Sequence, residues 1–575
     1  MPSLRTFLDS PLGRHPSLLA RKAADRLGLR KTSGPLPPVP VQRVSLPAGW
    51  SPALRRWLAN IPHEGGLHSF HTVFGSEFDE ATLLELCATG PKRGTRDLTG
   101  DIKLVWDFSR AHALVLNAWT APESTPASAA FLRRWTAACA DTDGPAWTCA
   151  MDVGIRAVNW IFADALTGGA LGREFGERDW AAWLWRHGLV IWRRLESRMI
   201  PSNHYLADLL GLAVIGSVFP DDASAQRWLR FARGEFPQAL LAQTHPDGGL
   251  DEASLRYHAF VTEMALLARL ALGGAFPSQA EDRLRSMCQI VADFRDAAGD
   301  VFPFGDDDSG RVLAIDDAST MGRADILLHL AATILGSSSQ QRDQAIYRDS
   351  GWWAHRAREF VVALEFGGVG LRGFGSHAHN DDLSLCVEWR GIPVIVDPGT
   401  YLYSADPEAR NRFRSAASHN SVVIDGREPL PLTKELFHLP GRTAAWPATA
   451  DADGGCSFVR SLADGLEHRR DVRPGNGTLA VSDQLTGGGR HLAQWSFHLH
   501  PDWTTRAEAG RFILSRDGKD LLLLALDGSA SGMKFEIVSG EFSAGYGRRC
   551  PIQVCRATRE GVFPFEAKWL LRAVS

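Results

Sequence analysis

Histidine and aspartate side chains lie next to strand-like apolar runs at three places in the C-terminal half of the chain. His377 and His379 belong to the run GSHAHNDDLSL at 375–385, Asp397 follows the run VIV, and His419 precedes the run VVI. Side chains on a strand alternate between its two faces, so the two histidines of the first run would share a face. Two imidazoles and a carboxylate at neighbouring strand ends are suitable ligands for a divalent metal ion. The alternative is a solvated, histidine-rich turn, but the spacing favours a functional site.

Polar groups of a different kind lie in the N-terminal half. Asn203 and His204 occur in SNHY, directly before an apolar helical pattern, and the Asn203 amide either caps that helix or has a functional role. Tyr257 ends the run DGGLDEASLRY, where a tyrosine at a helix start is more often a packing residue. A further segment, the acidic loop at 304–310, is expected to be a solvated turn, and the alternative is a loop that contacts a ligand or a metal ion.

An amide, a phenol and imidazoles, without an obvious pair of catalytic carboxylates, suit the eliminative cleavage of a uronate-containing polysaccharide. The C5 proton of a uronate is weakly acidic until hydrogen bonds or cations neutralise the adjacent carboxylate, which an amide, a protonated histidine or an arginine can do. A tyrosine or histidine then removes the proton, and another donates a proton to the leaving glycosidic oxygen. The alternative is a set of unrelated polar residues, because the sequence alone does not bring them together.

The spacing of apolar residues predicts helices first and strands second. Trp, Leu and Ala recur every three or four residues from about 50 to 345, which predicts helices at 131–140, 157–166, 180–195, 205–218, 225–243, 257–272, 284–297 and 324–335. Short β-rich runs separated by Gly, Asp and Asn predict strands at 360–366, 383–389, 394–396, 421–424, 479–483, 512–515, 521–526, 535–538 and 569–573. So many helices favour a toroid or solenoid over a four-helix bundle, and the strands favour an antiparallel sandwich. The predicted domains are an arm and linker at 1–45, a helical domain at 46–345 and an all-β domain at 346–575.

Composition narrows the class of protein. The 575 residues are too many for one ordinary core, and 45% hydrophobic and 22% charged residues are typical of a globular protein. A formal net charge of −4 gives no overall basic field, so no nucleic-acid partner is expected. The eight cysteines form no CxxC pair and indicate no disulfide framework. No run has the length of a membrane span, and the N-terminus lacks a signal-peptide pattern, so the chain as written is expected in the cytoplasm.

Five segments taken in order resemble the heparinase II/III-like polysaccharide lyases, a group that includes alginate lyases. They are SNHYL, SLRYHAF, GSHAHNDDLSL, VIVDPGTYLY and ARNRFRSAASHNSVVIDG, and the later run WSFHLHP is similar as well. The resemblance extends over nearly the whole chain. It implies an α+β multidomain fold, in which an incomplete (α/α) toroid is followed by an antiparallel β-sandwich domain. It also implies a lyase that cleaves an anionic polysaccharide such as a glycosaminoglycan, alginate or a bacterial exopolysaccharide.

The resemblance further implies roles for individual residues. Asn203 is similar to the asparagine that neutralises the uronate carboxylate, and His204 to its catalytic neighbour. Tyr257 resembles the catalytic tyrosine, a general acid that can also serve as base. His377 resembles the catalytic histidine of the β-domain, a base or a charge neutraliser according to the epimer attacked.

A structural zinc ion is also implied by the resemblance, with His379, Asp397 and His419 as its ligands. The residues expected to contact substrate are Arg256, His258, Arg410, Arg412 and Arg414, and a solvated loop is the alternative for the last three.

Two other functions fit the same residues. One is a non-catalytic glycan-binding or exopolysaccharide-assembly protein. The other is a glycoside hydrolase that uses carboxylates such as Asp251, Glu252 or Asp306. The resemblance suggests a periplasmic location, and it leaves the oligomeric state open, with a homodimer among the alternatives.

Overall fold

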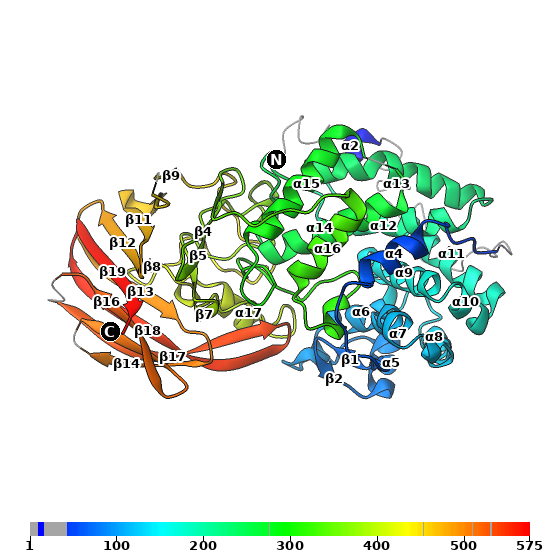
Figure 1. Ribbon diagram of the computed structural model, residues 1–575, viewed down its shortest axis with the longest axis horizontal. Coiled ribbons are helices and arrows are strands. Elements are labelled where there is room, and N and C mark those ends of the chain that lie inside the picture. Colours follow the sequence, from blue (N-terminus) through cyan, green and yellow to red (C-terminus); the bar gives the residue numbers. More distant parts are fainter. Residues whose placement is uncertain are drawn as a thin grey trace. The chain divides into compact units, whose positions relative to one another are not determined.

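The chain forms a helix-rich unit and a strand-rich unit that alternate along the sequence, as the computed structural model shows (Figure 1). The structure describes residues 10–15, 43–274, 276–451, 453–508, 510–528 and 532–574. The helical unit comprises 1–244, 259–288 and 310–339, and the β unit comprises 245–258, 289–309 and 340–575. Most of the arm predicted at 1–45 lies outside the described residues.

Every helix predicted from the sequence is present. The helices are α2 (Pro11–Arg14), α4 (Trp50–Leu58), α5 (Glu80–Thr89), α6 (Ile102–Arg110), α7 (Ala113–Thr120), α8 (Thr125–Ala138), α9 (Ala150–Leu166), α10 (Ala170–Phe175), α11 (Glu177–Arg194), α12 (Asn203–Val218), α13 (Ala223–Ala242), α14 (Leu255–Ala271), α15 (Ser278–Asp293) and α16 (Arg323–Leu335). Several begin a few residues earlier than predicted, and at α13 a polar cap precedes the apolar pattern. The Asp222 side chain there accepts the backbone N–H of Ala225. No described helix is long and apolar enough to cross a membrane.

Helix α9 is the centre of the helical unit. Each of its residues is buried, and it packs against α6, α7, α11 and α12. Glycines let α9 and α12 approach closely: a Cβ at Gly154 would lie 2.8 Å from the Ala207 carbonyl oxygen, and one at Gly211 would lie 2.7 Å from the Gly154 Cα. This crossing brings the first turns of the two helices together.

The described residues of the β unit form three antiparallel sheets. The sheet orders are β3-β4-β5-β6-β7, β17-β18-β13-β8 and β14-β15-β16-β19-β12-β11-β10-β9. The strands are β3 (Gln344–Tyr347), β4 (Trp352–Arg356), β5 (Phe360–Glu365), β6 (Leu385–Trp389), β7 (Ile392–Ile395), β8 (Val422–Ile424), β9 (Ala448–Ala450), β10 (Cys456–Ser461), β11 (Glu467–Pro474), β12 (Thr478–Thr486), β13 (Arg490–His498), β14 (Trp503–Glu508), β15 (Arg511–Arg516), β16 (Lys519–Leu526), β17 (Met533–Gly545), β18 (Arg548–Val562) and β19 (Phe565–Ala573). A short helix, α17 (Pro407–Arg414), lies between β7 and β8.

One hydrophobic core joins these sheets. Phe360 of β5, Trp495 of β13 and Trp569 of β19 come from three different sheets and belong to the same buried cluster. Along β12, buried and less buried residues alternate, as expected for a strand with one face on a core. The loops at the ends of β5, β7 and α17 carry the polar residues of the candidate site, so this core fixes their positions.

Candidate active site

Asp306 is the centre of a buried polar cluster in the β unit. Its carboxylate lies 2.9 Å from His377 Nδ1 and 2.7 Å from His379 Nε2, and it forms a two-pronged ion pair with Arg410. Burial alone would raise the pKa of Asp306, but the Arg410 charge and the two histidine hydrogen bonds outweigh it and hold the pKa well below its usual range. The acidic loop was predicted to be a solvated turn, and for Asp306, which is fully buried, that is wrong.

The backbone holds the Asp306 loop in place from two sides. The Asp306 N–H donates to the His377 carbonyl oxygen (2.9 Å), and the Ser254 hydroxyl donates to the Asp306 carbonyl oxygen (2.6 Å). Gly305 has a φ of +69°, and a Cβ there would lie 2.3 Å from the Ala253 carbonyl oxygen, so only glycine fits before Asp306. The acidic loop and the start of α14 are therefore fixed to each other.

His377 and His379 lie in the loop between β5 and β6, which begins only at Leu385. The two imidazoles do lie close together, as predicted, but no strand places them there. The two rings converge because both bind the same carboxylate. An ionised carboxylate only accepts hydrogen bonds, so each histidine donates an N–H to Asp306. His377 Nε2 then lies 3.4 Å from the buried Glu252 Oε2, and His379 Nδ1 has no hydrogen-bond partner among the described residues.

Tyr257 packs on His377. The two rings are stacked, with centroids 3.8 Å apart and an interplanar angle of 22°. Tyr257 belongs to the first turn of α14, and its N–H donates to the Ser254 hydroxyl at 3.1 Å. Burial, followed by the nearby Asp308 and Asp306 carboxylates, raises the pKa of Tyr257 well above its usual value. The phenol is therefore a neutral proton donor at ordinary pH.

Tyr403 is a member of this cluster that the sequence analysis did not assign. Its hydroxyl lies 3.1 Å from the Tyr257 hydroxyl, and the Arg410 guanidinium lies over its ring at 4.7 Å. The Tyr403 N–H donates to the Tyr546 hydroxyl at 2.8 Å. The only sequence signal was its place in VIVDPGTYLY, six residues after Asp397.

A second group of side chains in the β unit can hold a metal ion. Ligand atoms of His379, Asp381 and His419 all lie within 4.8 Å of one another. Among the described residues, His379 Nδ1 and His419 Nε2 are buried without a hydrogen-bond partner. Two such imidazole nitrogens beside a carboxylate fit the ligand set of zinc. Asp381, which the sequence analysis did not name, completes this set.

Asp397 orients one member of this group, His419. Its carboxylate lies 2.8 Å from His419 Nδ1, which leaves His419 Nε2 directed at His379 and Asp381. Asp397 follows β7 and His419 precedes β8, as the sequence predicts. A carboxylate that orients a ligating histidine is a common partner in metal sites.

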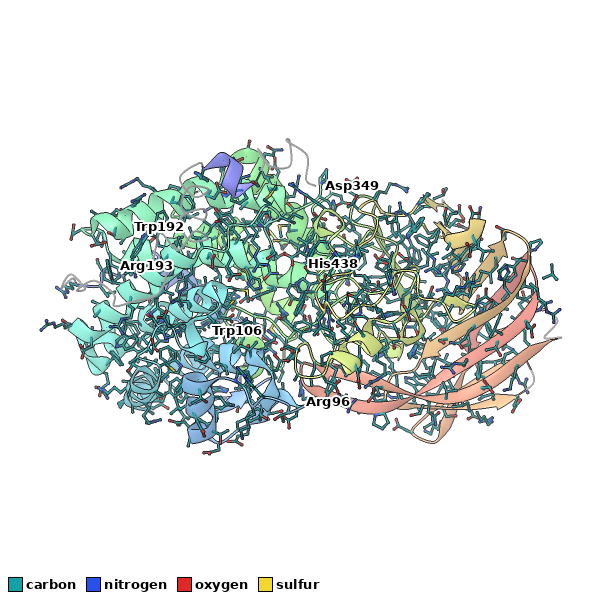
Figure 2. The ribbon with its side chains drawn as sticks, turned by 180° about the vertical axis from the view of Figure 1, so that it is seen from behind. Arg96, Trp106, Trp192, Arg193, Asp349 and His438 are labelled. Carbon is teal, nitrogen blue, oxygen red and sulfur yellow. The ribbon has the colours of Figure 1, made fainter. Side chains whose placement is uncertain are left out.

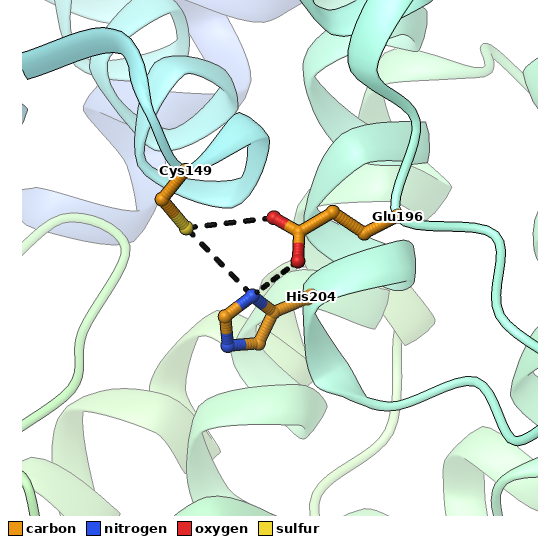
Figure 3. A group of neighbouring side chains, drawn as sticks. All are labelled: Cys149, Glu196 and His204. Carbon is orange, nitrogen blue, oxygen red and sulfur yellow. Dashed lines mark hydrogen bonds and ion pairs between the residues drawn. The ribbon is translucent and has the colours of Figure 1, made fainter. Parts of the chain in front are cut away.

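Asn203 and His204 belong to the helical unit. Asn203 is the first residue of α12 and is buried, while Ser202 occupies the N-cap position that the sequence analysis considered for Asn203. His204 Nδ1 lies 2.9 Å from Glu196 Oε2 and 3.7 Å from Cys149 Sγ (Figure 3). The structure thus gives His204 two specific neighbours.

The two residues at the start of α14 that were predicted to contact substrate, Arg256 and His258, instead contact other residues of the β unit. Arg256 forms ion pairs with Asp300 and, at 3.6 Å, with Asp307. His258 is fully buried, with its ring centroid 5.8 Å from that of Trp352. His258 therefore belongs to the interior.

The three predicted arginines of α17 have different surroundings. Arg410 and Arg414 are fully buried, the first against Asp306 and the second donating to the Leu436 carbonyl oxygen at 2.8 Å. Arg412 is exposed and forms an ion pair with Glu541 at 3.0 Å. The solvated-loop alternative therefore does not describe Arg410 and Arg414.

Comparisons with known proteins agree with this description. The model for the heparinase II/III N-terminus matches residues 193–308, and the model for the heparinase II/III-like C-terminal domain matches residues 339–568. The chain belongs to the heparinase II/III-like family. The fold predicted from the resemblance, a helical toroid followed by antiparallel sheets, is confirmed.

Solved structures of similar fold include heparinases and a heparan sulfate lyase. A heparinase III structure is 14% identical with a TM-score of 0.66, and the match covers 100% of this chain and 94% of that one. A second heparinase III is 15% identical with a TM-score of 0.61, covering 99% and 93%. The heparan sulfate lyase HepC mutant from Pedobacter heparinus is 15% identical with a TM-score of 0.59, covering 100% and 93%. No curated protein sequence matches the chain.

Proposed function

We propose that this chain is a polysaccharide lyase that cleaves a uronate-containing polysaccharide by β-elimination. Family membership and the fold shared with heparin and heparan sulfate lyases support the reaction class. The observation that carries the proposal is the stacking of Tyr257 on His377, with the Tyr257 hydroxyl hydrogen-bonded to Tyr403. This arrangement supplies a proton donor and an imidazole in one cluster.

Tyr257 is the proposed acid and His377 the proposed base. His377 Nε2 takes the C5 proton, because Nδ1 is occupied by Asp306. The electron pair of the C5–H bond forms the C4–C5 double bond while the C4–O bond breaks. Tyr257, kept neutral by burial, donates its proton to the departing glycosidic oxygen. Tyr403 donates to or accepts from the Tyr257 hydroxyl and so orients it.

Asn203 is the proposed neutraliser of the uronate carboxylate. An amide N–H that donates to the carboxylate stabilises the negative charge that develops when C5 loses its proton. His204, the next residue, is the proposed second contact to this group through Nε2, because its Nδ1 faces Glu196. These two roles rest on the family resemblance of the SNHYL segment. Asn203→Ala tests the first role, because it should lower kcat far more than it raises KM.

The β unit is the proposed site of a structural zinc ion. His379, Asp381 and His419 would hold it, with Asp397 orienting His419. When bound, the ion supplies a fixed cross-link between the loop before β6 and the segment before β8. Asp306 contributes by holding His379 through Nε2, so that Nδ1 is presented to the ion.

The experiment is a panel of uronate polysaccharides, including heparan sulfate, alginate and bacterial exopolysaccharides, incubated with the purified protein. A lyase produces ultraviolet absorbance from a 4,5-unsaturated uronide. Tyr257→Phe should abolish the signal while the circular dichroism spectrum stays unchanged. An unchanged rate in this variant would refute the role of Tyr257, and new reducing ends without absorbance would indicate a hydrolase instead.

A further inference from the structure

Three donor atoms of different chemistry converge in the helical unit. Cys149 Sγ lies 3.5 Å from Glu196 Oε1 and 3.7 Å from His204 Nδ1, and His204 Nδ1 lies 2.9 Å from Glu196 Oε2 (Figure 3). Ligand atoms of the three side chains all lie within 4.8 Å of one another. The thiol is buried, whereas His204 and Glu196 retain 31% and 15% side-chain exposure, so solvent reaches the group from one side.

This geometry differs from that of a catalytic triad. In a triad, the imidazole lies between nucleophile and carboxylate and uses one ring nitrogen for each. Here both Cys149 Sγ and Glu196 Oε2 meet the same nitrogen, Nδ1. Burial, followed by the Asp152 and Glu196 charges, also raises the pKa of Cys149 well above its usual value, so the free thiol is a poor nucleophile. The three atoms instead surround a common point.

We propose that Cys149, Glu196 and His204 form a second metal site, which binds zinc or a similar thiophilic divalent cation. Zn–S bonds of about 2.3 Å and Zn–N or Zn–O bonds of about 2.0–2.2 Å place tetrahedral ligands about 3.5 Å apart. The two distances from sulfur to its neighbours, 3.5 and 3.7 Å, match that spacing, and the hydrogen bond of 2.9 Å between His204 Nδ1 and Glu196 Oε2 must lengthen when the ion binds. A ligand set of thiolate, imidazole and carboxylate selects zinc over magnesium or calcium, which prefer oxygen alone.

Rigid elements hold the three ligands. Cys149 directly precedes α9 and His204 is the second residue of α12, and these helices cross closely at Gly154 and Gly211. The Glu196 N–H donates to Asp208 of α12 at 2.6 Å. A metal site formed by pre-positioned ligands costs little reorganisation on binding.

The segment before Cys149 is fixed as well. The indole N–H of Trp106, which is labelled in Figure 2, donates to the Thr148 hydroxyl at 3.1 Å and to the Pro145 carbonyl oxygen at 3.3 Å. Glu196 Oε1 accepts the Ala150 N–H at 3.1 Å, so the carboxylate is held at the N-terminus of α9 even without a metal. The exposed side of the group leaves the fourth position open for water.

Binding requires one proton exchange. The Cys149 thiol loses its proton to solvent when the metal–sulfur bond forms. The cation also replaces the hydrogen bond between Glu196 and His204, so the proton on His204 Nδ1 leaves that nitrogen and neutral His204 carries its proton on Nε2. The charge of the dication is then balanced by the thiolate and the carboxylate. Affinity should therefore increase with pH.

Cobalt(II) titration of the zinc-free full-length chain tests the proposal without any assay of activity. A thiolate bound to cobalt gives a charge-transfer band in the near ultraviolet, whereas His379, Asp381 and His419 contain no sulfur and give none. We expect one equivalent of cobalt to produce the band, and zinc to remove it by displacement. Cys149→Ser should lose the band, and Cys288→Ser, a matched buried cysteine of α15, should keep it.

His204→Gln is a second variant, at a side chain that is 31% exposed. It should bind cobalt at least about tenfold more weakly than the native chain, as expected for the loss of one of three ligands. Absence of the band from the native chain at excess cobalt would overturn the proposal. Persistence of the band in Cys149→Ser, or unchanged affinity in His204→Gln, would also overturn it. If the native chain shows no lyase activity but gives the cobalt results expected above, the proposed function is contradicted and the metal site is supported.

Discussion

Asp306 Oδ2 lies 2.9 Å from His377 Nδ1, and this contact determines which nitrogen of His377 is available for chemistry. The same carboxylate holds His379 through Nε2 at 2.7 Å. One buried group therefore sets opposite tautomers in two histidines that are two residues apart. His377 presents Nε2 and His379 presents Nδ1, which is consistent with the proposed role of the first in proton transfer and of the second at the proposed metal site.

Asp306→Asn should impair both stability and activity. The substitution removes the negative charge that neutralises buried Arg410, and breaking a buried ion pair costs about 3–5 kcal/mol. We expect the free energy of unfolding in urea to fall by about 3 kcal/mol. The control is Asp464→Asn, which removes an exposed partner of Arg427 and should change stability by less than about 0.5 kcal/mol. Equal effects of the two substitutions would contradict the central role of Asp306.

Tyr257→Phe and Tyr403→Phe should differ in magnitude. Loss of the general acid should lower kcat by at least about 100-fold, so that product formation by Tyr257→Phe is no longer detected. Tyr403 acts through one hydrogen bond to Tyr257, and a bond of about 1 kcal/mol corresponds to a loss of about fivefold. Steady-state kinetics on the same substrate measure both variants. A larger loss for Tyr403→Phe than for Tyr257→Phe would reverse the proposed roles.

His468 should make the β unit less stable in mild acid. Burial lowers the pKa of His468 to about 4, from 6.5, and its Nε2 donates to Asp483 at 2.7 Å. Because the folded state resists protonation, the unfolded state binds more protons between pH 6.5 and about 4. Stability is therefore complete above pH 6.5 and falls as the pH is lowered through this window.

Urea unfolding at about pH 7.5 and pH 4.5 measures this effect, which for His468 alone should be about 2–3 kcal/mol. His468→Gln cannot titrate, so the difference between the two pH values should shrink by that amount. An unchanged difference in this variant would show that other groups cause the acid sensitivity.

The metal ion proposed for the β unit is best measured in the Cys149→Ser background, where the second proposed site is absent. We expect about one zinc ion per chain, and its removal by a chelator should lower the melting temperature, because a ligand that binds only the folded state stabilises it. Asp381→Asn should reduce the zinc content. Full zinc retention in a His379→Ala, His419→Ala double variant would refute the site.

The sequence predicted elements better than contacts. Helix and strand patterns are local, so the spacing of apolar residues was enough to locate every helix that we predicted. It also located the strands β7 and β8, next to which Asp397 and His419 lie. The contact between Asp306 and His377 joins positions 71 residues apart, and no local pattern encodes it. Asp306 was consequently expected in a solvated turn.

Residues without a local signal were missed for the same reason. Tyr403 meets Tyr257 across 146 positions of the sequence, and Asp381 is one of several acidic residues in its run. Cys149 and Glu196 became candidates only when the folded chain brought them to His204. Arg410 and Arg414 are buried, which the sequence could not show, because it does not distinguish a solvated arginine from one that is enclosed in the protein interior.

The most direct test of the central claim is the mass of the oligosaccharides that the protein releases from a uronate polysaccharide. Elimination breaks the C4–O bond without adding water, so the two products of each cut together have the mass of the parent, and one of them carries an unsaturated uronide. We predict this result for the native chain and no product for Tyr257→Phe. Products that together exceed the parent mass by one water per cut, with no unsaturated end, would contradict the account.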